Sequence, residues 1–234
     1  MALSFVGGGT GSSGTGGNIT LTLTAGIAQN DVVYVAFGIG STTDKILAMT
    51  TAGYTKLAEV FISGTNLAVF RKVMGATPDS QAVCTGSGDA AEEAGAAFHV
   101  WRGADTTTPE DATTTTATGT AAAPDSPSIT TVTDAAIVLA IGANAINDAS
   151  VRTAPTGYGN AQSVAVNGNE LITVGMASKS VSPAGAENPA AWTAWDTADW
   201  GAATVAIRPA TAVPDLIAGP LSLPRFARPE VVGY

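Results

Sequence analysis

An internal repeat limits the folds available to this chain more than any other feature of the sequence. Four landmarks recur in the same order: an Asp before an apolar run, a Gly-Tyr pair, an Asn before another apolar run, and a final Arg. The pairs are Asp31 and Asp134, Gly53 and Gly157, Asn66 and Asn169, and Arg102 and Arg208. Their separations are 103, 104, 103 and 106 residues, so we expect two similar sets of elements over residues 31–103 and 134–208.

The apolar residues of both halves are spaced as in β-strands. Residues 19–23 alternate apolar and polar side chains, which is typical of a half-buried strand. Residues 32–39 and 136–142 are continuous apolar runs, as in strands that are covered on both faces. Further strands are predicted at residues 67–73, 96–102, 170–178 and 203–209, whereas no long segment has the periodicity of an amphipathic helix.

These patterns predict an all-β protein. Two repeated sets of strands favour a jelly-roll-like two-sheet β-sandwich over residues 1–210, in which each sheet shares strands from both halves. Residues 106–128, rich in Thr, Ala and Pro, are expected to form a long surface loop or an irregular edge strand. Residues 211–234 contain four prolines, which favour an extended C-terminal arm over a regular element.

Composition excludes several classes of protein. The net charge of −9 argues against nucleic acid as a partner, because phosphate binding needs clustered Lys and Arg. Cys84 is the one cysteine and His99 the one histidine, so an internal disulfide and a Cys/His zinc site are excluded. No apolar run reaches the ~20 residues of a membrane-spanning helix, and the N-terminus lacks the pattern of a secretory signal.

The glycine-rich segment at residues 5–18 resembles a phosphate-binding loop only superficially. Such a loop needs a following helix and usually a Lys, but a predicted strand follows here, and the first Lys is Lys45. We therefore expect a flexible connection or an extended arm.

The candidates for catalysis are few. His99 is the one possible histidine base, and its place in a strand favours an ordinary structural role over catalysis. Two acidic clusters could serve as carboxylate pairs or as a Ca²⁺ site, but a solvated loop is the simpler interpretation. Their members are Asp89, Glu92 and Glu93 in the first cluster, and Asp196 and Asp199 in the second.

Three of the four tryptophans lie close together in the sequence, at Trp192, Trp195 and Trp200. Exposed tryptophans can stack on sugar rings, so this segment is a candidate glycan-binding loop. Core packing or a subunit interface would also explain the cluster, and we weigh these two interpretations above a carbohydrate site.

Several segments together resemble β-sandwich virion proteins of tailed bacteriophages, which occur as capsid decorations, head fibres and tail-associated modules. The resemblance covers residues 4–210 and is carried by LSFVG, DVVYVAFGIG, TAGYTKL, NLAVFRKV, HVWRGAD and ATVAIRPA. It implies a β-sandwich fold, a place in the virion and no catalytic residues.

We therefore expect a non-enzymatic structural protein, without cofactor or metal, that decorates or cements a phage capsid. Its expected partners are other virion proteins, either major capsid or tail proteins, and further copies of itself, with no role for nucleic acid or membrane. The arm would dock to neighbours through its apolar and basic residues, namely Leu216, Ile217, Leu221, Leu223, Arg225, Phe226 and Arg228. The alternative is a tail-fibre or host-attachment module that binds host surface glycans through the tryptophan-rich loop.

Overall fold

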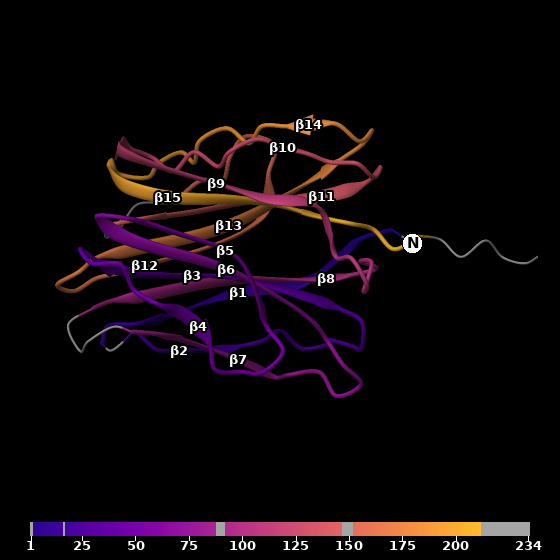
Figure 1. Cartoon of the computed structure of the whole chain (residues 1–234), viewed down its shortest axis with the longest axis horizontal. Coiled ribbons are helices and arrows are strands. Elements are labelled where there is room, and N and C mark those ends of the chain that lie inside the picture. Colours follow the sequence, from indigo (N-terminus) through magenta and orange to yellow (C-terminus); the bar gives the residue numbers. More distant parts are fainter. Residues whose placement is uncertain (1, 16, 88–91, 147–151, 212–234) are drawn as a thin grey trace, which may run out of the picture.

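The computed structural model describes residues 2–15, 17–87, 92–146 and 152–211. All regular elements in these ranges are β-strands, which confirms the predicted all-β class (Figure 1). The first half of the chain forms β1 (Ser4–Ser13), β2 (Ile19–Thr22), β3 (Val32–Ser41), β4 (Leu47–Met49), β5 (Thr55–Ile62), β6 (Gly64–Val73), β7 (Gln81–Gly86) and β8 (Ala94–Arg102). The second half forms β9 (Glu110–Ala122), β10 (Ile129–Thr130), β11 (Ala136–Asn144), β12 (Gly159–Val166), β13 (Ile172–Val181), β14 (Ala186–Glu187) and β15 (Ala198–Ile207).

Two five-stranded antiparallel sheets face each other at the centre of the molecule. Their strand orders are β1-β8-β3-β6-β5 and β12-β13-β11-β15-β9. Each is covered on its outer side by smaller strands, β2-β7-β4 below and β10-β14 above, as Figure 1 shows. The structure is therefore a β-sandwich whose two main sheets both have a covered outer face.

Each main sheet is built from one half of the chain, so the prediction that the sheets share strands from both halves is wrong. The interleaving expected of a jelly roll is absent here. After each short strand of the outer layer the chain returns to the main sheet that it left, and among the described residues it passes to the other main sheet once, between β8 and β9. When β3, β5, β6 and β8 are matched with β11, β12, β13 and β15, the strand order is the same in both sheets.

The core lies on both sides of the two central strands. Every residue of β3 and β11 is buried, as their continuous apolar sequences predict. Alternate residues of β3, such as Tyr34, face Leu139 and Ile141 of the opposite sheet. The residues between them, such as Phe37, pack against Leu21 of the outer layer. Burying each such side chain contributes roughly 1.5–3 kcal/mol.

The glycine-rich N-terminal segment is an edge strand, β1, and not the flexible connection or arm expected from its composition. Its residues pair with β8 from Ser4 to Ser13, interrupted by one bulge between Phe5 and Gly7. A Cβ at Gly11 would lie 2.8 Å from side-chain atoms of Ile19 and Leu21. The glycines are needed because the outer layer packs directly on this strand.

The Thr-rich segment after β8 is also an edge strand, which was one of its two predicted forms. β9 pairs with β15 along its length, with several irregularities in register. Its side chains alternate between half-buried and exposed positions from Thr115 to Thr120. A Cβ at Gly119 would lie 2.4 Å from the ring of Trp200, so this glycine makes room for the indole.

One arrangement of side chains occurs in both halves, at the turn that precedes β5 and the turn that precedes β12. Gly53 and Gly157 have φ values of 86° and 84°, a conformation that glycine adopts without strain. The Tyr that follows each Gly lies under a Lys ammonium, at 5.5 Å for Lys72 and 5.8 Å for Lys179. Each Lys also forms an ion pair, with Asp79 in the first half and Glu187 in the second. The turns are therefore attached to the sheets by the same chemistry.

We expect the contact between the two main sheets to supply much of the stability. Leu139→Ala should lower the free energy of unfolding by about 2–5 kcal/mol, because it leaves a cavity between the sheets. Ile46→Ala is the control, since the Ile46 side chain is 72% exposed, and should change stability by less than about 0.5 kcal/mol. Urea denaturation measures both, and equal losses would contradict this view of the core.

Candidate functional site

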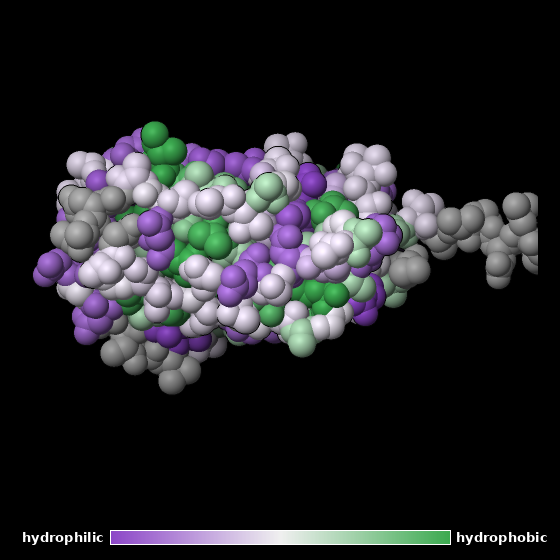
Figure 2. Space-filling view, turned by 90° about the horizontal axis from the view of Figure 1, so that it is seen from below, coloured by the Kyte–Doolittle hydropathy of each residue, from purple (hydrophilic) through white to green (hydrophobic). Residues whose placement is uncertain are grey.

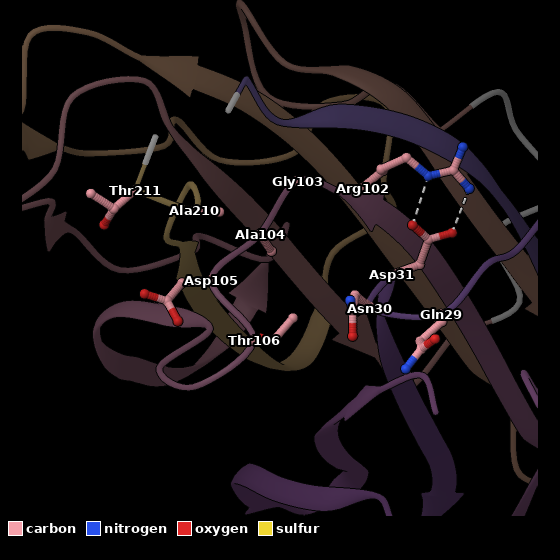
Figure 3. Close-up of a pocket in the computed structure, with 10 residues that line it drawn as sticks. All are labelled: Gln29, Asn30, Asp31, Arg102, Gly103, Ala104, Asp105, Thr106, Ala210 and Thr211. Atoms are coloured by element: carbon pink, nitrogen blue, oxygen red, sulfur yellow. Dashed lines mark hydrogen bonds and ion pairs between the residues drawn. The ribbon is translucent and has the colours of Figure 1, made fainter. Parts of the chain in front are cut away.

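A hollow of about 500 Å³ opens at the end of the sandwich where the described chain both begins and ends. Ser4 pairs with Arg102 there, and the N–H of Ala210 donates to the carbonyl of Gly103. Figure 3 shows the lining residues, which come from the segment before β3, the segment after β8 and the residues after β15. They are Gln29, Asn30, Asp31, Arg102, Gly103, Ala104, Asp105, Thr106, Ala210 and Thr211.

An ion pair between Asp31 and Arg102 forms one wall of this hollow. The guanidinium Nε and Nη2 donate to the two carboxylate oxygens of Asp31 at 2.8 and 2.7 Å (Figure 3). Asp31 is buried and also accepts the N–H of Ala28, while Arg102 donates to the carbonyl of Gly26. The hydrogen bond to Asp31 and its negative charge raise the pKa of Arg102. The pair holds the loop before β3 against the end of β8.

Asp105 supplies the second carboxylate of the hollow. Its Oδ1 accepts the N–H groups of Thr108 and Thr107 at 3.0 and 2.8 Å, and these bonds lower its pKa. Both carboxylates accept hydrogen bonds from backbone N–H groups of their own loops. The hollow is lined by polar and charged groups, but neither carboxylate is arranged as a general base with a nucleophile beside it.

His99 lies between the two main sheets and not in a cleft. Its Nε2 is 2.9 Å from the carbonyl of Asn160, and since a carbonyl only accepts, Nε2 carries the proton. The ring packs edge-on against Phe5, and Nδ1 has no hydrogen-bond partner among the described residues. Burial lowers its pKa to about 4, so His99 is neutral at pH 7. This placement agrees with the structural role that we preferred.

The described members of the first acidic cluster stabilise loops. Glu92 is buried and binds the Lys45 ammonium and the Ser41 hydroxyl. Glu93 is also buried, and its oxygens accept the N–H groups of Asn169 and Glu170 in the turn between β12 and β13. Asp89 lies outside the described residues.

The second acidic cluster lies just before and at the start of β15. The backbone carbonyl of Asp196 accepts the Asn144 amide, and that of Asp199 accepts the Thr65 hydroxyl and the N–H of Ala145. The backbone of this segment thus connects β15 with β6 and β11. Among the described residues, no group of three or more His, Cys, Asp or Glu side chains could hold a metal ion.

The three tryptophans of the candidate glycan loop are buried, with exposed fractions of 1%, 6% and 8% for Trp192, Trp195 and Trp200. Trp192 and Trp195 contact each other at a ring-centroid distance of 5.1 Å. Trp192 and Trp195 also pack over Gly175, where a Cβ would lie about 3 Å from their rings. The indoles therefore belong to the core of the second half and do not form an exposed platform for sugar rings.

Cys84 is buried, and desolvation raises the pKa of its thiol to about 12, so the thiol is protonated at pH 7.

The predicted docking residues of the arm, from Leu216 to Arg228, lie outside the described residues. In the part of the chain that is described, no helix is long and apolar enough to cross a membrane.

The hollow beside Asp31 and Arg102 was not predicted from the sequence as a site. Asp31 and Arg102 were found only as landmarks of the repeat, and their separation of 71 residues gives no sign that they pair. Their counterparts behave differently: Arg208 pairs with Asp111, and Asp134 accepts the N–H of Ala184. Comparison with known proteins adds no assignment, because no family model, curated protein or solved structure matches the chain.

The neutral, buried state of His99 predicts a pH dependence of stability. The unfolded state binds a proton at His99 near pH 6.5, and the folded state does so only near pH 4. Stability is therefore lost as the pH falls from 6.5 to 4, by about 3 kcal/mol in total.

His99→Gln keeps a donor for the Asn160 carbonyl but removes this titration. Chemical denaturation at pH 7 and pH 4 should show a loss of stability that is about 3 kcal/mol smaller in the variant than in the wild type. Equal losses in the two proteins would contradict the assignment, because the carboxylates contribute equally to both.

Proposed function

We propose that this protein is a non-enzymatic structural component of a tailed-phage particle that decorates or cements the capsid. In this proposal the sandwich presents its surface outward, and residues 211–234 dock onto neighbouring subunits. The segments that resemble phage virion proteins are spread over β1, β3, the turn before β5, and the strands β6, β8 and β15. The resemblance is therefore to the framework of the fold and not to one loop.

The position at which the described chain ends is the observation that carries the docking proposal. Thr211 lies at one end of the sandwich, beside the hollow formed with Asp31, Arg102 and Asp105. The 23 residues after it contain eight Val, Ile, Leu or Phe side chains and four prolines. A segment that starts at an end of the sandwich can reach a neighbour without disturbing the pairing of any described strand.

The chemistry of the segment also favours docking. Prolines restrict the unbound chain and so lower the entropy that is lost on binding. Burying an apolar side chain contributes roughly 1.5–3 kcal/mol, against about 1–2 kcal/mol for ordering the backbone of a residue. Arg225 and Arg228 add charge-assisted contacts to an acidic neighbour.

The arrangement of the charged groups supports a non-enzymatic role. His99 is buried between the sheets, and Glu92 and Glu93 are buried with protein partners. Figure 2 shows the face of the molecule on which β2, β4 and β7 lie. Most of this face is polar or neutral, and its apolar residues form separate patches. Such a surface suits a protein that is displayed in many copies without non-specific association.

Truncation after Ala210 tests the docking role. The truncated protein should stay folded, with a melting temperature close to that of the full chain, because the Ala210 N–H bond to Gly103 is kept. It should no longer assemble on particles, as measured by quantitative mass spectrometry of purified virions.

A full-length variant separates the apolar contacts from the length of the segment. Leu221→Ser with Phe226→Ser should reduce incorporation, whereas Val132→Ser, at a side chain that is 66% exposed on the sandwich, should not. Normal incorporation of the truncated protein would show that the arm is not the anchor.

A further inference from the structure

The turn between β12 and β13 contains the only Asn-Gly pair of the chain, Asn167 followed by Gly168. Both residues are exposed and lie outside the strands. Among the described residues, neither the side-chain amide of Asn167 nor the backbone N–H of Gly168 has a hydrogen-bond partner. The two groups are therefore free to move relative to each other.

An exposed Asn amide is open to attack by the backbone nitrogen of the residue that follows it. Here the Gly168 nitrogen would form a bond with Cγ of Asn167 and give up its proton, while the side-chain amide leaves as ammonia. Water then opens the cyclic succinimide at either carbonyl, which gives aspartate or isoaspartate. Glycine in the second position favours ring closure, because it has no side chain and reaches backbone conformations that other residues rarely adopt.

Hydrogen bonding of the attacking nitrogen separates Asn167 from several other asparagines. The backbone N–H that follows Asn169 donates to Oε2 of Glu93. The N–H groups that follow Asn30 and Asn144 donate to backbone carbonyls. A nitrogen that donates such a bond is held away from the preceding side chain. The nitrogen that follows Asn167 is not held in this way.

The packing between the two halves of the chain requires the glycine at position 168. A Cβ at Gly168 would overlap with the carboxylate of Glu93, which lies just before β8. The same carboxylate attaches the turn by accepting the N–H groups of Asn169 and Glu170 at 2.8 and 2.5 Å. The contact that fixes this turn therefore also keeps an unhindered residue after Asn167.

We propose that Asn167 is a site of spontaneous deamidation, and that its modification loosens the contact between the β12–β13 turn and the first half of the chain. The new carboxylate would stand one residue from the backbone of Gly168, on which Glu93 packs, so two negative charges would meet there. Isoaspartate also adds a methylene to the backbone of a turn that packs closely, since a Cβ at Gly40 would overlap with the carbonyl of Glu170. The inference does not depend on the proposed virion role.

Incubation of the full-length protein at mildly alkaline pH tests the modification. A synthetic peptide of residues 163–171 is incubated beside it until half of the peptide has reacted. Peptide mapping by mass spectrometry should then find aspartate and isoaspartate at position 167 of the protein, with Asn169 unchanged. Asn167→Gln is the control, because its longer side chain closes a ring far more slowly, and this variant should keep its mass and its elution in anion exchange.

Urea denaturation measures the structural consequence. The isoaspartate form, separated by anion exchange, should unfold at a lower urea concentration than the fresh wild type. Asn167→Asp adds the charge without the extra methylene and should lie between the two, whereas incubated Asn167→Gln should match its fresh sample. An intact Asn167 in the incubated protein, equal conversion of Asn169, or an isoaspartate form as stable as the wild type would each overturn the proposal.

Discussion

The burial of two central strands on both faces is the constraint on which the rest of the structure depends. β3 and β11 have no exposed side, so each main sheet must be covered from within and from without. The inner cover is the opposite sheet, and the outer cover is a small sheet or a loop with tryptophans. This need explains why so much of the chain outside the main sheets forms short strands and close-packed connections.

Close packing in turn explains where the glycines are. A Cβ at Gly40 would lie 2.2 Å from the carbonyl oxygen of Glu170, and those at Gly119 and Gly175 would meet tryptophan rings. At these three positions a glycine within a strand marks a place where another layer approaches the backbone. Composition alone suggested flexibility for the glycine-rich N-terminus, whereas the glycines of β1 allow the outer layer to pack on it.

Several of the charged side chains described above have structural partners. Asp31 and Arg102 attach a loop to β8, Glu93 attaches the β12–β13 turn, and the Lys72 and Lys179 pairs attach two matching turns. These pairs hold the framework together, and the surface on which the proposed docking role rests is the end of the sandwich at Thr211.

The sequence by itself determined the all-β class and the position of most of the central strands, because side-chain alternation and apolar runs are local properties of the chain. It also indicated that the tryptophans favour a core or an interface. Only the tertiary structure decided that each half forms its own sheet, that residues 4–13 are an edge strand, and that Asp31 pairs with Arg102. These outcomes depend on which distant segments pack together, and packing between segments far apart in the chain leaves no periodic signal in either of them.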